Sequence, residues 1–141
     1  MLAKELMRRE VFTIRDDRPL SELIDLLVRE HIHGCPVVDR NGELVGIVTQ
    51  QDVFFSAVTR DRAEGSGESK KRRGTPEALE VRDLMTSPAV SADEETEILN
   101  LCRMMHRLRI HRVPIVKDGK VTGIISSLDV LGQLADGTEK V

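Results

Sequence analysis

Two short stretches of this sequence place a hydroxyl group and a carboxylate at the same spacing. The stretch GIVTQQD contains Thr49 and ends at Asp52, and the stretch GIISSLD contains Ser126 and ends at Asp129. A carboxylate can accept two hydrogen bonds from a vicinal diol such as ribose, and each charge-assisted bond contributes roughly 1.5–3 kcal/mol. A helix that begins here would add unpaired N–H groups and a positive dipole end, which attract phosphate. The motif therefore suits a nucleotide.

The same spacing also has a purely structural explanation. A threonine or serine followed three residues later by an acid forms a capping box, in which the hydroxyl and the acid each accept one backbone N–H at the start of a helix. The glycines that open the two stretches, Gly46 and Gly123, favour the ligand instead, because a glycine weakens a strand but lets another molecule approach its backbone. The sequence leaves both explanations open.

Histidines and cysteines offer a second kind of chemistry. The four histidines are His31, His33, His106 and His111. Their spacing matches no recognised zinc-ligand set, so we expect no metal site. Cys102 falls on an apolar helical stripe and is expected to pack there. Cys35 lies beside a predicted strand, where it would be a small neutral wall residue or, alternatively, a thiol that senses oxidants.

A basic run from Lys70 to Arg73 lies in the segment RDRAEGSGESKKRRGTPEALE, which is rich in glycine, serine and charge and has no apolar period. Such a segment is typical of a solvated linker, although four adjacent positive charges could also hold phosphate or nucleic acid. The chain has no tryptophan or tyrosine that could stack on bases. We therefore expect a flexible polar linker over residues 61–78 and no nucleic-acid partner.

Composition limits the class of protein. The 141 residues are 40% hydrophobic and 32% charged, with a net charge of −3, which gives no general attraction to nucleic acid or to an anionic membrane. The N-terminal segment MLAKELMRRE is charged, and no apolar run approaches the roughly 18 residues of a membrane span. Two cysteines are too few for a disulfide framework. We expect a cytoplasmic protein with no membrane contact.

The elements that position the motif follow from the hydrophobic periods. Apolar residues at helical spacing predict a helix with one buried stripe in each half of the chain. The two stripes are Leu20, Leu23, Ile24, Leu27 and Val28, and Ile98, Leu101, Cys102 and Met105. Next come CPVVD and VPIVK, short β-branched runs opened by a proline, which suits the first residue of a strand.

Hairpins follow these strands. The turns DRNGE and KDGK contain Asn-Gly and Asp-Gly, which favour tight β-hairpins, and they lead into the strands LVGIVT and VTGIIS. A further short strand is expected near VFTIR and near PAVSA. Each half therefore has the predicted order β-α-β-β-α.

The two halves are copies of one another. An offset of 78 places Pro36 on Pro114 and Leu6-Met7 on Leu84-Met85, and after the hairpin turn the offset falls to 77. Each half alone would be only marginally stable, so the two halves are expected to pack on each other to bury enough apolar surface. We expect one copy at residues 1–60, the linker at 61–78, the second copy at 79–136 and a tail at 137–141.

These pieces, all present twice, make the chain resemble a tandem pair of cystathionine β-synthase (CBS) domains, also called a Bateman module, in a stand-alone CBS-domain protein. The shared pieces are the Leu-Met opening, the helix, the proline strand, the D-x-x-G or D-G turn and the motif G-h-h-[ST]-x-x-D-[VL]. The resemblance implies an α/β (α+β) fold in which the two copies pack sheet to sheet by pseudo-twofold symmetry and leave two related clefts.

In this family the clefts bind adenosine-containing ligands such as AMP, ADP, ATP or S-adenosylmethionine. By position, the resemblance assigns Asp52 and Asp129 to the ribose hydroxyls, and Thr49 and Ser126 to ribose or phosphate. The opening glycines belong to the same motif. The walls of the base pockets would be Cys35 and Pro36 or Val113 and Pro114, together with Thr13 and Ile14 or Ser91 and Ala92.

The copies differ where phosphate would bind. The second copy reads HRVPI, with His111 and Arg112, a pair that the family often uses on phosphates, whereas the first copy reads HGCPV, with Gly34 in place of the arginine. Arginine has a planar fork that suits phosphate, and glycine offers only backbone. We therefore expect unequal sites, with the Asp129 site the better one for an anionic nucleotide.

No nucleophile elbow, phosphate-binding Walker loop, metal-ligand motif or GxGxxG motif is present, so we expect a binding protein and not an enzyme. The hypothesis is a regulatory module that needs no cofactor, senses an adenine nucleotide, forms a homodimer and signals through an unknown effector protein. One alternative is a ligand-free dimerisation or scaffold module. Another is a redox or metal sensor that uses Cys35 and the histidines.

Overall fold

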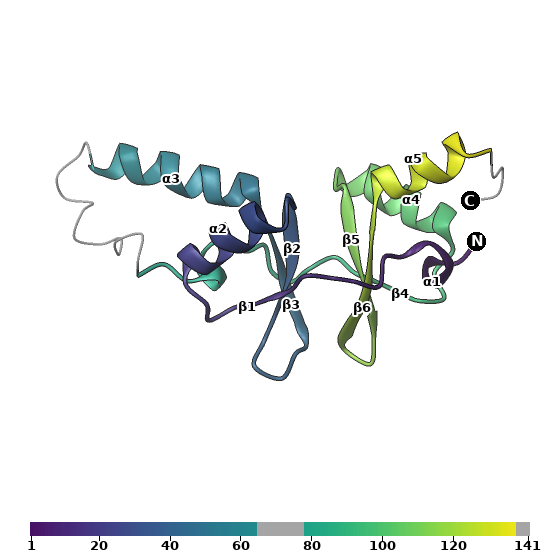
Figure 1. Ribbon diagram of the computed structural model, residues 1–141, viewed down its shortest axis with the longest axis horizontal. Helices are drawn as coiled ribbons and strands as arrows, with labels where there is room; N and C mark the ends of the chain where they lie inside the picture. Colours follow the sequence, from purple (N-terminus) through teal and green to yellow (C-terminus); the bar gives the residue numbers. More distant parts are fainter. Residues whose placement is uncertain (65–77, 138–141) are drawn as a thin grey trace. The chain divides into compact units, whose positions relative to one another are not determined.

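The computed structural model describes residues 1–64 and 78–137 and divides into two compact units. Unit 1 consists of Met1–Val11 and Val90–Val141, and unit 2 consists of Phe12–Ala89. Each unit contains one three-stranded sheet, with its helices gathered against one face of that sheet (Figure 1). The basic run from Lys70 to Arg73 and the last four residues of the predicted tail lie outside the described residues.

Unit 2 contains the strands and long helices of the first copy, together with a 3-10 turn from the opening of the second copy. In chain order they are β1 (Ile14–Arg15), α2 (Leu20–Arg29), β2 (Gly34–Val38), β3 (Leu44–Thr49), α3 (Gln50–Glu64) and the 3-10 turn η2 (Val81–Asp83). Strand β2 is central, with β1 parallel and β3 antiparallel to it. Helix α3 continues to Glu64, so the first four residues of the predicted linker are helical.

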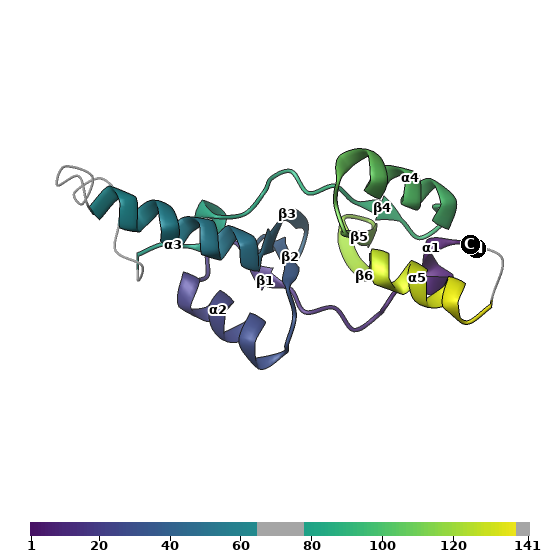
Figure 2. The same cartoon turned by 90° about the horizontal axis from the view of Figure 1, so that it is seen from above.

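Unit 1 contains the strands and long helices of the second copy, together with a short helix from the opening of the first copy. In chain order they are α1 (Ala3–Leu6), β4 (Ala92–Asp93), α4 (Ile98–Leu108), β5 (Arg112–Lys117), β6 (Lys120–Ser126) and α5 (Ser127–Ala135). Its sheet has the same order, β4-β5-β6. Figure 2 shows the hairpin of each unit from above, with the two long helices of the unit beside it. The predicted order β-α-β-β-α and the α/β class are confirmed in both copies.

The predicted turn chemistry explains why the hairpins close. Asp118 and Gly119 both have positive φ angles, 53° and 81°, as a tight hairpin turn requires. Gly42 has a φ angle of 81° at the corresponding turn. Glycine and aspartate adopt this backbone conformation at lower cost than most residues, which places the turns where the sequence predicted them.

The core of each unit lies between the sheet and one stripe of the first long helix. Leu23 is fully buried in α2, and Ile98 and Leu101 are fully buried in α4. The predicted stripe was too wide, however, because 42% of Ile24 and 69% of Val28 are exposed. A sheet of three short strands covers only part of the apolar arc of α2, so the rest of that arc remains on the surface.

The two copies exchange their opening segments. Ala3 and Met7 belong to the hydrophobic core of unit 1, where Arg8 pairs with Ile124 of β6. In unit 2, Thr86 of the second copy pairs in the same way with Ile47 of β3. Each Leu-Met opening therefore packs on the strands of the other copy, and the compact units do not coincide with the sequence repeats.

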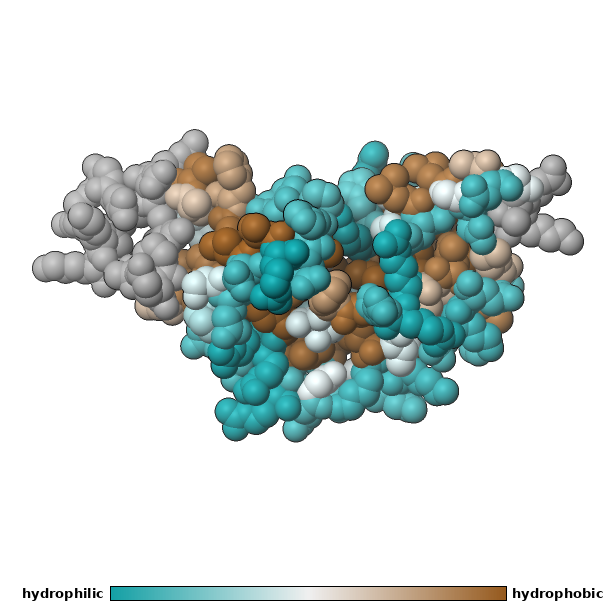
Figure 3. Space-filling view, viewed as in Figure 1, coloured by the Kyte–Doolittle hydropathy of each residue, from teal (hydrophilic) through white to brown (hydrophobic). Residues whose placement is uncertain are grey.

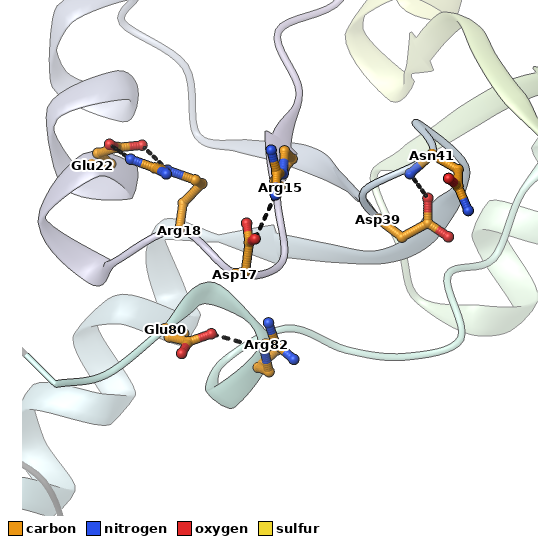
Figure 4. A network of polar contacts seen from close by, with 8 residues as sticks. All are labelled: Arg15, Asp17, Arg18, Glu22, Asp39, Asn41, Glu80 and Arg82. Atoms are coloured by element: carbon orange, nitrogen blue, oxygen red, sulfur yellow. Dashed lines mark hydrogen bonds and ion pairs between the residues drawn. The ribbon is translucent and has the colours of Figure 1, made fainter.

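Backbone hydrogen bonds hold the opening segment of the second copy in unit 2, and local ion pairs lie beside them (Figure 4). The Val81 N–H donates to Arg18 O over 2.9 Å, and the Arg82 N–H donates to Asp16 O over 3.0 Å. Arg15 donates to Asp17, and this bond lowers the pKa of the Asp17 carboxyl. Further ion pairs join Arg18 to Glu22 and Arg82 to Glu80.

No helix in the described part of the chain is long and apolar enough to cross a membrane.

Candidate ligand-binding site

Strand alternation divides the predicted site residues into two sets. Side chains along a strand point alternately to its two faces, and the hydrophobic cores identify the face that the helices cover. The residues on the covered face are Ile14, Cys35, Gly46, Ala92, Val113 and Gly123. The face away from the helices of the same unit receives Thr13, Pro36, Thr49, Ser91, Arg112, Pro114 and Ser126. The polar members of the predicted site thus share one face of each sheet.

Residues on the covered face can offer a ligand little more than their backbone. Val113 is fully buried in the core of unit 1, and Ile14 is 7% exposed in the core of unit 2. Cys35 is 1% exposed, and burial raises the pKa of its thiol to about 12. A protonated and inaccessible thiol is a poor target for oxidants, which argues against Cys35 as a redox sensor.

The motif glycines have a packing explanation. A Cβ atom on Gly46 would lie 2.7 Å from Met85 Sδ and 2.8 Å from Thr86 O. A Cβ atom on Gly123 would collide with the side chain of Met7. The chain's own methionines fill this space, which corrects the expectation that the glycines make room for another molecule on that face.

Both motif aspartates take part in capping boxes. The Thr49 N–H donates to Asp52 Oδ2 over 2.8 Å, and the Asp52 N–H donates to Thr49 Oγ1 over 3.3 Å. The Ser126 N–H donates to Asp129 Oδ2 over 2.8 Å, and the Asp129 N–H donates to Ser126 Oγ over 3.2 Å. The structural explanation of the repeated motif is therefore confirmed. In both copies one carboxylate oxygen, Oδ2, makes the backbone bond.

The second carboxylate oxygen distinguishes the copies. Asp129 Oδ1 accepts a hydrogen bond from Arg8 Nε at 2.9 Å, and only 9% of the Asp129 side chain is exposed. Asp52 Oδ1 has no protein partner within residues 1–64 and 78–137. An ionised carboxylate has acceptor sites on both oxygens, so Asp52 keeps the capacity to accept hydroxyl groups from a ligand.

Among the strand residues that the structure describes, a cation is the ladder partner of the motif hydroxyl residue in one copy only. Arg112 and Ser126 are direct partners in the β5–β6 ladder, as are Gly34 and Thr49 in the β2–β3 ladder. A Cβ atom on Gly34 would lie 2.8 Å from Val48 O, so the local backbone disfavours a side chain there. The difference between the copies that the sequence indicated is thus present on the polar face of each sheet.

His33 and His111 connect the strands to the helices that follow. The Gln50 N–H donates to His33 O over 2.8 Å, and the Ser127 N–H donates to His111 O over 2.9 Å. The His33 ring also lies 3.2 Å from Gln50 Oε1. In the described ranges no three His, Cys, Asp or Glu side chains are grouped as a metal would require.

Two apolar grooves were missed at the sequence level. One, of about 790 Å³, lies between α2 and α3 and is lined by residues that include Ile24, Val28 and Phe54. The other, of about 370 Å³, lies at the equivalent place between α4 and α5 and is lined by residues that include Cys102 and Leu131. The signal was an apolar helical stripe wider than one small sheet can cover. Figure 3 shows hydrophobic surface over α3 and α5.

Comparison with known proteins agrees with this architecture. The chain is 31% identical over 136 residues to the protein MJ1404 of Methanocaldococcus jannaschii, an alignment that covers 94% of this chain and 31% of that protein. The chain spans between 22% and 31% of the length of three curated relatives that it matches.

Two solved structures resemble nearly the whole chain. The CBS domain of a CBS domain-containing membrane protein from Sphaerobacter thermophilus has a TM-score of 0.72 and 30% identity, covering 94% of this chain and 86% of that one. CBSX2 in complex with AMP has a TM-score of 0.78 and 25% identity, covering 98% of both chains. The family model of the CBS domain matches residues 3–58 and 81–136. The chain therefore belongs to the CBS domain family and carries two CBS domains in tandem.

Proposed function

We propose that the protein is a regulatory module that binds an adenosine-containing ligand, of the AMP, ADP, ATP or S-adenosylmethionine class, and signals its occupancy to a partner protein. The observation that carries this proposal is the free Oδ1 of Asp52, at the start of a helix and three residues after Thr49. The solved structure of CBSX2, which aligns with nearly the whole chain, is that of its complex with AMP. This likeness supports an adenine nucleotide as the ligand.

The polar face of each sheet supplies the remaining contacts. In unit 2, Asp52 accepts the ribose hydroxyls and Thr13 lies beside the ligand, whereas Pro36, whose side chain is fully buried, contributes backbone only. In unit 1, the guanidinium of Arg112 binds phosphate next to Ser126, because its planar fork matches phosphate oxygens. Core-facing residues such as Val113 contribute backbone groups.

The two units differ in what a ligand must displace. At Asp129 a ribose would compete with Arg8 for Oδ1, whereas at Asp52 no protein group in the described ranges occupies the corresponding oxygen. A phosphate-bearing ligand offsets this cost, since Arg8 can exchange the carboxylate of Asp129 for the phosphate. We therefore assign neutral or cationic adenosine ligands to the Asp52 site and anionic nucleotides to the Asp129 site.

The proposed role is binding and not catalysis. Ligand binding shifts an equilibrium between packing states by no more than its difference in affinity for the two states. Output then passes through a homodimer and an effector protein, and we place this function in the cytoplasm without nucleic-acid or membrane contact. The exposed apolar surface beside α2 and α4 supports self-association.

The test is a stability assay with a ligand panel of AMP, ADP, ATP and S-adenosylmethionine. A bound ligand at 100 times its Kd should raise the free energy of unfolding by about 2.7 kcal/mol. Asp52→Asn keeps an oxygen that can cap the helix but removes the charge, and it should weaken ligand binding at the Asp52 site at least about tenfold. Glu43→Gln, an exposed carboxylate change in the hairpin, serves as the matched control and should bind normally.

A ligand-free scaffold is the second candidate, because the capping boxes account for both aspartates without a ligand. The scaffold predicts that no member of the panel changes the free energy of unfolding. A ligand-induced change in the free energy of unfolding that is equal in Asp52→Asn and in the wild type would likewise favour the scaffold, because Asp52 would then make no ligand contact.

A further inference from the structure

The residue after each Leu-Met pair occupies an equivalent place in the two units. In unit 1, the Arg8 N–H donates to Ile124 O over 3.0 Å, and the Ile124 N–H donates to Arg8 O over 3.0 Å. In unit 2, the Thr86 N–H donates to Ile47 O over 2.9 Å, and the Ile47 N–H donates to Thr86 O over 3.0 Å. The offset of 78 also places Arg8 on Thr86, so the sequence and the backbone pairing give the same equivalence.

The motif aspartates follow these backbone pairs at the same spacing. Asp129 lies five residues after Ile124, and Asp52 lies five residues after Ile47. Both carboxylates accept a backbone N–H through Oδ2 at 2.8 Å. The second oxygen, Oδ1, therefore has an equivalent position relative to Arg8 in unit 1 and to Thr86 in unit 2.

The side chain at this position differs between the units. Arg8 reaches Asp129 Oδ1 with its Nε at 2.9 Å, because Nε lies at the end of a flexible methylene chain. Thr86 is also exposed, but its hydroxyl is uncharged and is attached directly to Cβ. Asp52 Oδ1 has no protein partner among the residues that the structure describes. The short side chain of Thr86 thus leaves open the oxygen that Arg8 occupies in the other unit.

We infer that the residue after the Leu-Met pair determines the charge of the ligand that each site accepts. Arg8 selects anionic nucleotides at the Asp129 site, and Thr86 leaves the Asp52 site open to uncharged or cationic ligands. Adenosine must break the ion pair between Arg8 and Asp129 to reach Oδ1, whereas AMP brings a phosphate that replaces the carboxylate on the guanidinium. The selecting residue of each site comes from the opening segment of the other copy. This inference rests on the proposed binding of adenosine-containing ligands.

The test exchanges the two side chains and measures affinity for AMP and for adenosine, which differ by one phosphate. Thr86→Arg gives Asp52 Oδ1 a guanidinium partner. The ratio of AMP affinity to adenosine affinity at the Asp52 site should then rise at least about tenfold, the size of one charge-assisted hydrogen bond. Arg8→Thr should lower the same ratio at the Asp129 site by a similar factor. The double variant Arg8→Thr/Thr86→Arg should show both changes in one protein.

NMR titration measures the two sites separately in the whole chain. The amide signals of residues 50–52 report on the Asp52 site, and those of residues 127–129 report on the Asp129 site, because each set begins the helix that follows its motif. Thr86→Met is the matched control, since it adds a long side chain without charge. It should leave the ratio of the two affinities at the wild-type value.

A second measurement needs no ligand. The guanidinium introduced by Thr86→Arg should give an NMR signal of an Nε–H that is protected from exchange with water, and Thr86→Arg/Asp52→Asn should lose this signal. Absence of the signal overturns the inference. An ion pair that only stabilises the fold would change the free energy of unfolding but not the ratio of affinities.

The outcomes separate this inference from the function on which it rests. A wild-type protein that binds AMP or adenosine, with an unchanged ratio in Thr86→Arg or an equal change in Thr86→Met, overturns the inference alone. A wild-type protein that binds no member of the ligand panel overturns the proposed function, and the inference with it.

Discussion

At the scale of single residues, the second oxygen of each motif aspartate decides what the site can bind. Both carboxylates cap a helix through Oδ2, yet among the residues that the structure describes only Asp129 also pairs with an arginine, Arg8. Because 72% of the Arg8 side chain is exposed, this ion pair contributes at most about 1 kcal/mol and can exchange partners easily. Arg8 is therefore expected to act on ligand choice more than on stability.

Arg8→Ala tests this expectation. Removal of the guanidinium frees Asp129 Oδ1 for ribose and removes a partner for phosphate, so affinity for adenosine should rise while affinity for AMP should fall or stay unchanged. Titration calorimetry with both ligands measures the two effects. Arg9→Ala is the matched control, since in the described part of the chain Arg9 donates only to Lys4 O. A parallel change for both ligands would contradict a charge-selective role.

Cys35 gives a prediction about pH. Burial raises the pKa of its thiol from 9.0 to about 12, so between these values the unfolded chain ionises while the folded chain stays protonated. The free energy of unfolding should therefore be unaffected by this group below about pH 9 and should fall above it, by at most roughly 1.4 kcal/mol per pH unit. Denaturant titrations from pH 8 to pH 10.5 should show a shallower fall in Cys35→Ala. Equal slopes would mean that the thiol is accessible.

The site residues could be predicted only in part from the sequence. The repeated hydroxyl–aspartate spacing located both helix starts, because a capping box is a local structure of four residues. The partner of Asp129 Oδ1 could not be predicted, since Arg8 lies 121 residues away and reaches the aspartate only through the exchange of opening segments. The capping box and a ligand contact also share the same sequence pattern, so spacing alone cannot separate them.

At the scale of elements, each opening segment packs on a hairpin through a methionine that lies against a glycine, Met7 on Gly123 and Met85 on Gly46. Gly123→Ala should destabilise the protein by about 1–3 kcal/mol, because the new methyl group overlaps the Met7 side chain. Gly132→Ala, in α5 with nothing within 4 Å, is the control and should be neutral or stabilising. Chemical denaturation measures both values. A loss of AMP binding with unchanged stability in Gly123→Ala would instead support a direct ligand contact.

The elements themselves were largely predictable because they follow from local patterns. The hairpins rest on Asp-Gly and Asn-Gly turns, and the helices rest on apolar residues at helical spacing. The exposure of Ile24 and Val28 was not predictable, because the width of the buried stripe depends on how many strands the helix covers. A stripe wider than its sheet is a local sign of a surface that another element or subunit covers.

At the scale of the whole molecule, the exchange means that the N-terminal segment supports the unit built from the C-terminal copy. Met7→Ala removes a buried side chain from the core of unit 1 and should cost about 2–5 kcal/mol. Hydrogen exchange should then accelerate in β5 and β6 more than in β2 and β3. Met1, which is 36% exposed and lies outside both core clusters, is the matched site for a control substitution. Acceleration confined to unit 2 would contradict the exchange.

The exchange of opening segments also determines what happens when the chain is cut between residues 64 and 78. The N-terminal fragment then contains the first copy and the opening segment that completes unit 1. The C-terminal fragment contains the second copy and the opening segment that completes unit 2. Each fragment lacks a piece of its own core that the other one carries. The two fragments would therefore fold only in each other's presence. A polypeptide that contains a single copy would need the opening segment of another molecule to complete its core.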